Sequence, residues 1–333
     1  MKTKHSQNQS YDLQELNFES NLKNVKEDVG QVKVPIIDLY NFEQRFKEIS
    51  EDLWQAATQV GFFQLTRHGI ALDTINTAFD ASKSFFSLNK TQKSQYPLKN
   101  GLNAGWEYME QVRPSTGSAD QKESYQITLP HMQDLWPNTE LTQFKQDVLT
   151  MEHQAWSLGM KVLSCFAYKL GFQRDFFTQA HNKDKADYQS TLRLLHYLPQ
   201  DKDTQFDKNT WRAGAHTDFD CLTMVFQKQG QGGLQVCPGK NADQHQSWTE
   251  VDAIDGVITC NIGDMLMRWS DDKLKSTFHR VRMPKPEEIT QARYSMAFFC
   301  QANKNVIIQG SEKSYKPISA EDYLNMRIAA NFA

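Results

Sequence analysis

The sequence predicts a mainly β protein with flanking helices, in which helices dominate the first half and short strands the second. Apolar residues recur at helical spacing over residues 41–60, 72–86 and 147–170, and Gly61 and Gly171 are placed to end two of these helices. In the second half, the pattern changes to short apolar runs separated by Gly, Asn, Asp or Pro. Successive short strands of this kind favour an antiparallel barrel or sandwich over a doubly wound sheet.

The remaining elements follow from local composition. A short strand is expected at 34–39, where β-branched residues dominate and Pro35 can start the strand, and a second strand at 62–65. Residues 100–137 are rich in Gly, Pro and Ser, which predicts an excursion of loops and short strands. A final helix is expected at 320–330. The later strands are expected at 192–198, 222–226, 234–237, 257–262, 279–283 and 294–299.

Composition and charge exclude several classes of protein. The 333 residues are 39% hydrophobic and 23% charged, which is typical of a globular chain and not of a disordered one. The net charge of -3, from 37 Lys and Arg against 40 Asp and Glu, gives no basic excess for nucleic acid. We therefore expect no nucleic-acid partner, and the sequence indicates no obligate protein partner.

Cysteine usage and the apolar runs indicate a cytoplasmic protein. The five cysteines form no C-x-x-C pair, so reduced and mostly buried thiols are expected instead of disulfides or a thiolate zinc site. The polar N-terminal residues contain no apolar core of a secretory signal. The longest apolar runs are far shorter than a membrane span, so no membrane association is expected.

Two histidines and an aspartate form a candidate metal site. In His216-Thr217-Asp218, which precedes a predicted strand, residues two apart point to the same side of an extended backbone. His279 begins another predicted strand and is the candidate for the third ligand. Two imidazoles and one carboxylate on one face leave three octahedral positions open, which suits Fe(II) that must bind a co-substrate and O2. An H-x-D tripeptide also arises by chance, and each histidine alone could be a hydrogen-bonded structural residue.

Motifs along nearly the whole chain resemble those of one family. In the second half these are Gly214-Ala215-His216-Thr217-Asp218, Gly232-Gly233-Leu234-Gln235-Val236, Asn261-Ile262-Gly263-Asp264 followed by Trp269, Ser276-Thr277-Phe278-His279-Arg280-Val281 and Arg293-Tyr294-Ser295. In the first half they are Val34-Pro35-Ile36-Ile37-Asp38, Gly61-Phe62-Phe63-Gln64 with His68-Gly69-Ile70, Phe85-Phe86 with Leu88, and Asp120-Gln121-Lys122-Glu123. In this order they resemble the isopenicillin N synthase-like family of Fe(II)/2-oxoglutarate-dependent oxygenases, although Arg67 stands where that family usually has Asn.

The resemblance implies a fold and the roles of individual residues. The expected core is a distorted double-stranded β-helix, or jelly-roll, with flanking helices. By position, His216, Asp218 and His279 match the family's iron ligands, and they are our candidate catalytic and metal-binding residues. Arg293 and Ser295 match the residues that hold the distal carboxylate of 2-oxoglutarate. A guanidinium can donate two charge-assisted hydrogen bonds to a carboxylate, and a hydroxyl two residues along a strand lies on the same side.

A third co-substrate residue is expected at Tyr197, which matches a tyrosine that contacts substrate or co-substrate in relatives. Leu198 stands where a second proline is common, so the register is open by one residue. His196 is the alternative contact, or it satisfies a hydrogen bond in the core. Composition and the change from helical to strand pattern, together with the resemblance, divide the chain into a polar lead-in at 1–32, a helical and strand region of the single domain at 33–175, and a jelly-roll catalytic core with the C-terminal helix at 176–333.

The implied activity is oxidation of a C–H bond in a small-molecule metabolite, by hydroxylation, desaturation or cyclisation. The implied cofactors are Fe(II), 2-oxoglutarate and O2, with succinate and CO2 as co-products. Two alternatives remain open at this point. One is an Fe(II) oxidase of the same fold that does not use 2-oxoglutarate, and the other is a non-catalytic binding protein. The complete set of candidate ligands argues against the second.

Residues that would define the substrate are less well indicated. The excursion at 101–125, with Trp106 and Tyr108, and Arg327 in the final helix are candidates to line the pocket, and packing or solvated surface is the alternative for each. Trp269 is interpreted as a core aromatic residue. Residues 240–246 are polar and are expected to form a surface hairpin.

Overall fold

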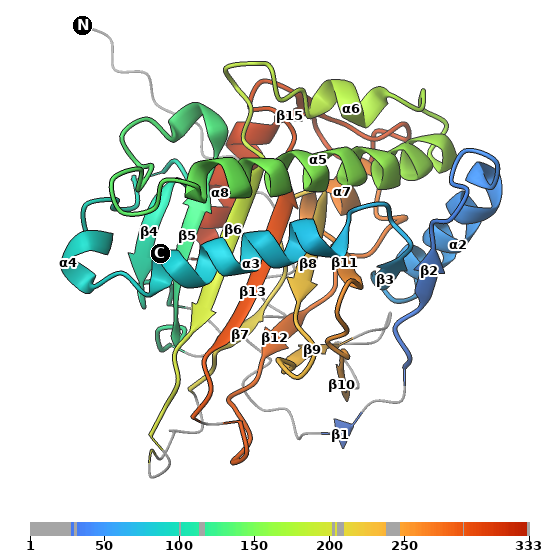
Figure 1. Cartoon of the computed structure of the whole chain (residues 1–333). Coiled ribbons are helices and arrows are strands. Elements are labelled where there is room, and N and C mark those ends of the chain that lie inside the picture. Colours follow the sequence, from blue (N-terminus) through green and yellow to red (C-terminus); the bar gives the residue numbers. More distant parts are fainter. Residues whose placement is uncertain are drawn as a thin grey trace, which may run out of the picture.

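Two sheets and a layer of helices make up the fold (Figure 1). The computed structural model describes residues 28–29, 32–99, 101–112, 117–201, 204, 210–237, 247–288 and 290–331. The larger sheet contains, in spatial order, β2 (Ile36–Asp38), β3 (Phe62–Thr66), β11 (Ile258–Ile262), β8 (Leu222–Gln227), β13 (Arg293–Cys300), β6 (Thr191–Tyr197), β5 (Lys122–Ile127) and β4 (Gly105–Tyr108). The smaller sheet contains β1 (Asp28–Val29), β10 (Ser247–Glu250), β9 (Leu234–Val236), β12 (His279–Val281) and β7 (Ala213–His216). A separate hairpin joins β14 (Ile307–Ile308) to β15 (Ile318–Ser319).

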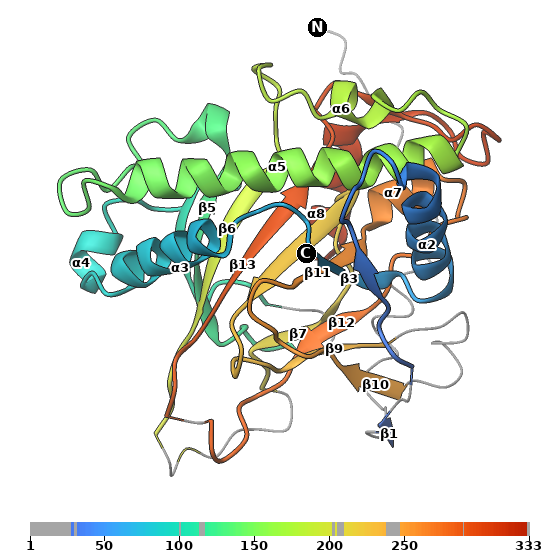
Figure 2. The ribbon, with the colours of Figure 1, turned by 45° about the vertical axis from the view of Figure 1, so that its right-hand side comes forward.

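Helices cover one face of the larger sheet, where α5 and α3 run across its strands (Figures 1 and 2). The helices are α2 (Phe46–Gln59), α3 (Leu72–Phe86), α4 (Lys90–Lys93), α5 (Phe144–Lys169), α6 (Phe176–Ala180), α7 (Asp264–Trp269) and α8 (Ala320–Asn331), with a 3-10 turn at Leu129–His131. The main apolar core lies between these helices and the sheet. A second cluster joins apolar residues of β3, β6 and β13 in the larger sheet to residues of β7, β9 and β12 in the smaller one. The opposite face of the larger sheet is therefore an interior shared by the two sheets.

The predicted elements correspond closely to those of the structure. The helix expected at 72–86 coincides with α3, and the mainly antiparallel strand pairing agrees with the predicted architecture, with β2 and β3 as a parallel pair in the larger sheet. The helix expected at 41–60 begins only at Phe46, after a turn in which Asn41 has a φ of 51°. The excursion at 100–137 contributes β4 and β5, and β5 pairs with β6 inside the larger sheet.

The state of the cysteines and the absence of a membrane span among the described residues can also be compared with the predictions. All five cysteines are free and buried, as predicted. Among the described residues, no helix combines the length and apolar character needed to cross a membrane. The surface hairpin expected at 240–246 and nearly all of the lead-in at 1–32 lie outside the described residues.

Gly61 is required where α2 turns into β3. Its φ is +77°, and a Cβ at this position would lie 2.5 Å from the carbonyl oxygen of Lys275. We expect Gly61→Ala to lower the free energy of unfolding by more than about 1 kcal/mol, because it adds backbone strain and a backbone clash. Gly69→Ala is the matched control, since Gly69 has a φ of +92° but no atom within 4 Å of a Cβ. Urea unfolding of both variants tests this. Equal losses in the free energy of unfolding would show that the clash with the carbonyl oxygen of Lys275 adds nothing to the backbone strain.

Candidate metal centre and co-substrate site

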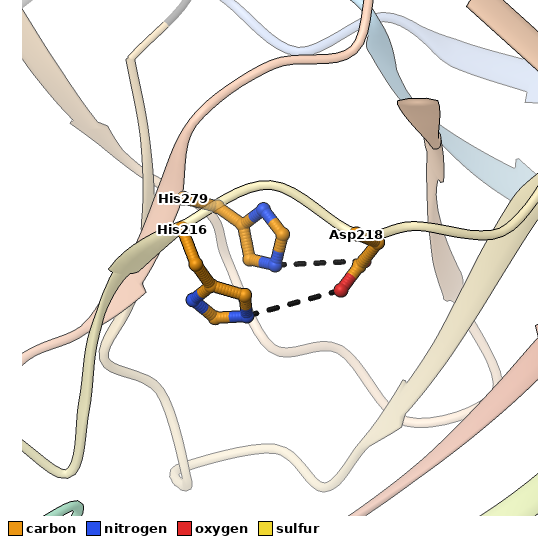
Figure 3. A group of neighbouring side chains, drawn as sticks. All are labelled: His216, Asp218 and His279. Atoms are coloured by element: carbon orange, nitrogen blue, oxygen red, sulfur yellow. Dashed lines mark ion pairs between the residues drawn. The ribbon is translucent and has the colours of Figure 1, made fainter. Parts of the chain in front are cut away.

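The pairing of two strands in the smaller sheet places the candidate metal ligands together. His216 ends β7 and His279 begins β12, and the two residues are direct partners in the antiparallel pair. Their ring centroids are 4.3 Å apart. Asp218, two residues after His216, points its carboxylate back at both rings (Figure 3). Nε2 of His216 lies 3.8 Å from Oδ1 of Asp218, and Nε2 of His279 lies 3.6 Å from Oδ2.

Hydrogen bonds to main-chain carbonyls orient both imidazoles. Nδ1 of His216 lies 2.7 Å from the oxygen of Gly214, and Nδ1 of His279 lies 3.3 Å from the oxygen of Thr277. A carbonyl oxygen only accepts, so Nδ1 carries the proton in the bonded neutral ring. Nε2 then carries the lone pair, and it is the ring nitrogen that lies on the side of Asp218. Such hydrogen bonds typically fix the tautomer and orientation of metal-binding histidines.

The larger sheet holds the carboxylate of Asp218. The hydroxyl of Thr223 on β8 donates to Oδ2 at 2.7 Å, and the side-chain amide of Asn261 on β11 donates to the same oxygen at 2.8 Å. Asp220, beside them, is fully buried, and burial together with the charge of Asp218 raises its pKa. Thr223 was not identified from the sequence, and Asn261 was noted only as part of a motif. Their donors define one orientation for a carboxylate that would otherwise rotate freely.

The resulting donor set fits Fe(II). One ligand atom from each of His216, Asp218 and His279 lies within 4.8 Å of the other two, and Asp218 and His279 are buried. Two imidazole nitrogens and one carboxylate oxygen on one face are typical of non-haem Fe(II) oxygenases, because they leave positions for co-substrate and O2. The predicted ligands are therefore gathered into one cluster.

The co-substrate residues predicted from the sequence also lie together, on the interior face of the larger sheet. Arg293 on β13 and Tyr197 on β6 are direct cross-strand partners, and the guanidinium carbon of Arg293 lies 4.6 Å from the centroid of the Tyr197 ring. Nη1 of Arg293 donates to the hydroxyl of Ser295 at 3.3 Å. All three residues are buried. Burial lowers the pKa of Arg293.

Comparisons with known proteins match the chain to families that agree with this geometry. Residues 188–302 match the 2OG-Fe(II) oxygenase superfamily, and residues 34–146 match the N-terminal region described as non-haem dioxygenase in morphine synthesis. A 2-oxoglutarate-Fe(II) type oxidoreductase of Emericella nidulans is 30% identical over 79% of this chain and 78% of its own length. A 2-oxoglutarate-dependent dioxygenase of Didymella fabae is 30% identical over 81% of this chain and 84% of its own. The chain belongs to the 2OG-Fe(II) oxygenase superfamily.

Solved structures of similar proteins agree with this assignment. A full-length protein of Neurospora crassa, solved in complex with alpha-KG, superposes with a TM-score of 0.79, at 29% identity over 92% of this chain and 98% of that one. The fold is thus the expected double-stranded β-helix. The protein is a non-haem Fe(II) 2-oxoglutarate-dependent dioxygenase that acts on small molecules, and Fe(II), 2-oxoglutarate and O2 are its cofactors and co-substrates. The comparisons support this function over a ketoacid-independent oxidase and over a non-catalytic binding protein.

In this oxygenase, the side chains of Tyr197 and His196 lie on opposite faces of β6. Nδ1 of His196 lies 2.8 Å from a carboxylate oxygen of Glu123, and its ring stacks on Tyr294 with centroids 4.7 Å apart. These contacts lie on the helix-covered face of the larger sheet. His196 therefore satisfies a buried hydrogen bond, which was one of the two alternatives, and Tyr197 is the residue beside Arg293.

Two aromatic residues considered for the pocket of the oxygenase lie on the same helix-covered face. The indole of Trp106 donates to Glu123 at 2.7 Å, and Tyr108 is the cross-strand partner of Glu123. Trp106 is buried, whereas Tyr108 is exposed. The alternative given for them, packing for Trp106 and solvated surface for Tyr108, is the one observed, because alternation along β4 turns both side chains away from the interior. Trp269 is a core aromatic residue, as predicted, and packs against Phe177.

Arg327 of α8 reaches the loop that carries the candidate metal ligands His216 and Asp218. Its guanidinium pairs with Asp264 at 2.6 Å, and both side chains are almost completely buried. Thr217, between His216 and Asp218, donates to Asp264 at 3.0 Å and accepts from Arg327 at 3.3 Å. Burial raises the pKa of Asp264, and the positive charge of Arg327 opposes this rise. Neither packing nor solvated surface describes Arg327, which belongs to a buried ion pair.

Proposed function

We propose that His216, Asp218 and His279 are the Fe(II) ligands of this oxygenase. The observation that carries the proposal is the cluster of their three ligand atoms within 4.8 Å, with both Nε2 atoms facing the carboxylate. A bound Fe(II) would supply the site at which O2 is activated. The work of the chain is to keep both imidazoles neutral and the carboxylate ionised and oriented. Because ligand protonation competes with the metal, iron affinity should fall in acid.

We further propose that Arg293, Ser295 and Tyr197 bind the distal carboxylate of 2-oxoglutarate. Arg293 offers a guanidinium, and Ser295 and Tyr197 offer hydroxyls on the same interior face. A co-substrate held at both ends cannot drift from the position in which its ketoacid group chelates iron, and such positioning lowers the barrier to reaction. Oxidative decarboxylation to succinate and CO2 is then coupled to oxidation of a C–H bond of a small metabolite, by hydroxylation, desaturation or cyclisation.

The proposed substrate wall lies beside the metal end of the same face. Phe299 on β13 is the cross-strand partner of Thr223, which contacts Asp218. The guanidinium carbon of Arg193 on β6 lies 5.0 Å from the centroid of the Phe299 ring. An aromatic face beside a half-buried guanidinium suits a compact polar molecule. The proposal is supported by the Neurospora relative, which was solved in complex with thymine and with 5-formyluracil, both compact polar molecules.

Anaerobic titration tests the ligand assignments directly. Purified apo-protein receives Fe(II) and then 2-oxoglutarate, and the visible absorption is recorded. A weak charge-transfer band that appears only with both additions would support ketoacid chelation at iron. Stoichiometric Fe(II) binding without this band would contradict the proposed co-substrate site, and absence of Fe(II) binding would contradict the proposed ligands.

Replacing Arg293 should separate co-substrate binding from iron binding. We expect Arg293→Gln to raise the Kd for 2-oxoglutarate about tenfold to a hundredfold, because a charge-assisted pair is lost. The Kd for Fe(II) should change little, since Arg293 contacts no proposed ligand. The same titration measures both constants. An unchanged Kd for 2-oxoglutarate would exclude Arg293 as the anchor.

A further inference from the structure

A second buried arginine lies beside the proposed co-substrate anchor. Arg212 immediately precedes β7, four residues before His216, and only 4% of it is exposed. Its guanidinium carbon lies 6.0 Å from the centroid of the Tyr197 ring, and that of Arg293 lies 4.6 Å from the same centroid. One aromatic ring therefore lies beside two guanidinium groups, one from β13 of the larger sheet and one from the bend that precedes β7.

No carboxylate among the described residues pairs with either guanidinium. Arg293 donates to the carbonyl oxygens of Gln231 and Gly232 and to the hydroxyl of Ser295, all of which are neutral. Nε of Arg212 is buried and has no hydrogen-bond partner in the described part of the chain. The neighbouring carboxylates of Asp120 and Glu288 form ion pairs with other residues.

Asp120 binds Lys122, and Glu288 binds Arg282. Two like charges are thus buried side by side without a counter-ion from this part of the protein. Burial lowers the pKa of Arg212 to about 10, and the positive charge of Arg293 adds to this effect. A buried unpaired cation is costly unless an anion compensates it. The cost is recovered when an anion binds.

An unpartnered amide lies on the other side of the Arg293–Ser295 pair. Gln227 on β8 is the direct cross-strand partner of Ser295 and is 4% exposed. Among the described residues, neither its Nε2 nor its Oε1 has a hydrogen-bond partner. A buried amide without partners is uncommon in a folded protein and indicates a missing polar ligand. Polar groups without partners among the described residues therefore lie on both sides of Arg293.

We propose that Arg212 and Arg293 together bind one carboxylate beside Tyr197, that this is the distal carboxylate of 2-oxoglutarate, and that Gln227 supplies a further donor. This inference rests on the proposed co-substrate role of Arg293 and adds Arg212 as a second cationic anchor. Each guanidinium can donate two parallel hydrogen bonds to a carboxylate, so two guanidiniums can surround one carboxylate with charged donors. The site should therefore bind a ketoacid with a second carboxylate much more tightly than one without it.

The test compares two ketoacids that differ only at the distal end. Anaerobic Fe(II)-protein is titrated with 2-oxoglutarate and with 2-oxopentanoate, which lacks the distal carboxylate, and the absorption band reports binding of each. Arg212→Gln should weaken 2-oxoglutarate about tenfold or more, since a hydrogen bond to a charged group is lost. Its affinity for 2-oxopentanoate should stay within about twofold of wild type. Arg212→Lys, which keeps the charge but not the fork, should fall between wild type and Arg212→Gln.

Arg174→Gln is the control, because it removes a guanidinium that pairs with Glu43 and lies over the ring of Phe46, without contact to Tyr197. It should leave the preference for 2-oxoglutarate over 2-oxopentanoate unchanged. Thermal unfolding without ketoacid provides a second readout. Arg212→Gln should then unfold at the same temperature as wild type or higher, since an uncompensated charge is removed, whereas loss of a purely structural residue would lower the melting temperature.

The outcomes separate this inference from the proposed function. If Arg293→Gln loses 2-oxoglutarate affinity but Arg212→Gln does not, Arg212 is not an anchor and the proposed function stands. If Arg212→Gln weakens both ketoacids equally, or melts at a lower temperature without ketoacid, its role is structural and the inference is overturned. If neither arginine affects 2-oxoglutarate, the assignment of Arg293 fails as well.

Discussion

Replacing His279 by alanine is expected to abolish stoichiometric Fe(II) binding and, with it, turnover. Asp218 and His216 would remain, but two ligands do not form the three-point site that Fe(II) requires here. Nε2 of His279 lies 3.6 Å from Asp218, so its removal also leaves the carboxylate without its neighbour across the site. The fold should survive, because His279 is held by one long hydrogen bond to a carbonyl and by an edge contact with Phe62.

Two companion variants make the His279 prediction specific. His153→Ala removes an exposed imidazole from α5 and should bind one Fe(II) per chain, as wild type does. Asn261→Ala keeps all three proposed ligands but removes a donor to Asp218, and should weaken Fe(II) about tenfold to a hundredfold. Iron analysis after desalting and anaerobic titration measure these effects. One retained Fe(II) per chain in His279→Ala would remove this residue from the site.

The sequence predicts much of this fold because periodicity and terminating glycines act locally. The helix at 72–86 coincides with α3, and each later predicted strand corresponds to a strand of the structure. The proposed ligands were identified from the sequence through the family motifs, because an H-x-D tripeptide alone also arises by chance. That His216 and His279 face each other depends on the pairing of β7 with β12, which local sequence does not specify.

The parts that the sequence did not predict depend on which face of a strand a residue occupies. A shift of one residue moves every side chain of a strand to the other face, so the sequence favoured Tyr197 but left His196 open as the alternative until the pairing of β6 was known. Alternation along β4 likewise places the side chain of Trp106 on the helix-covered face of the larger sheet, which local sequence does not indicate. Arg212 and Gln227 have no distinctive local pattern, because they stand out only by their buried polar atoms, which have no hydrogen-bond partner in the part of the chain that the structure describes.

Breaking the ion pair between Asp264 and Arg327 is expected to cost about 3–5 kcal/mol of stability, because one buried charge loses its partner. Arg327→Met leaves Asp264 without its cation in a site that is fully buried. The pair also holds Thr217, and the backbone amide of Asp264 donates to the carbonyl oxygen of Asp218 at 2.8 Å. The loop between His216 and Asp218 should therefore become mobile, and Fe(II) affinity should fall along with stability.

Replacing both members of this buried pair distinguishes the electrostatic role of Arg327 from simple packing. Adding Asp264→Asn to Arg327→Met removes the stranded charge, and the double variant should recover part of the lost stability, since replacement of a buried ion pair by neutral side chains is often tolerated. Glu321→Gln on the same helix breaks only the partly exposed pair with Lys304 and should cost less than about 1 kcal/mol. Urea unfolding and Fe(II) titration of the three proteins test this. If Arg327→Met is no less stable than Glu321→Gln, the ion pair does not hold α8 against the loop between His216 and Asp218. If the double variant is no more stable than Arg327→Met, the loss of stability reflects packing of the arginine side chain and not its charge.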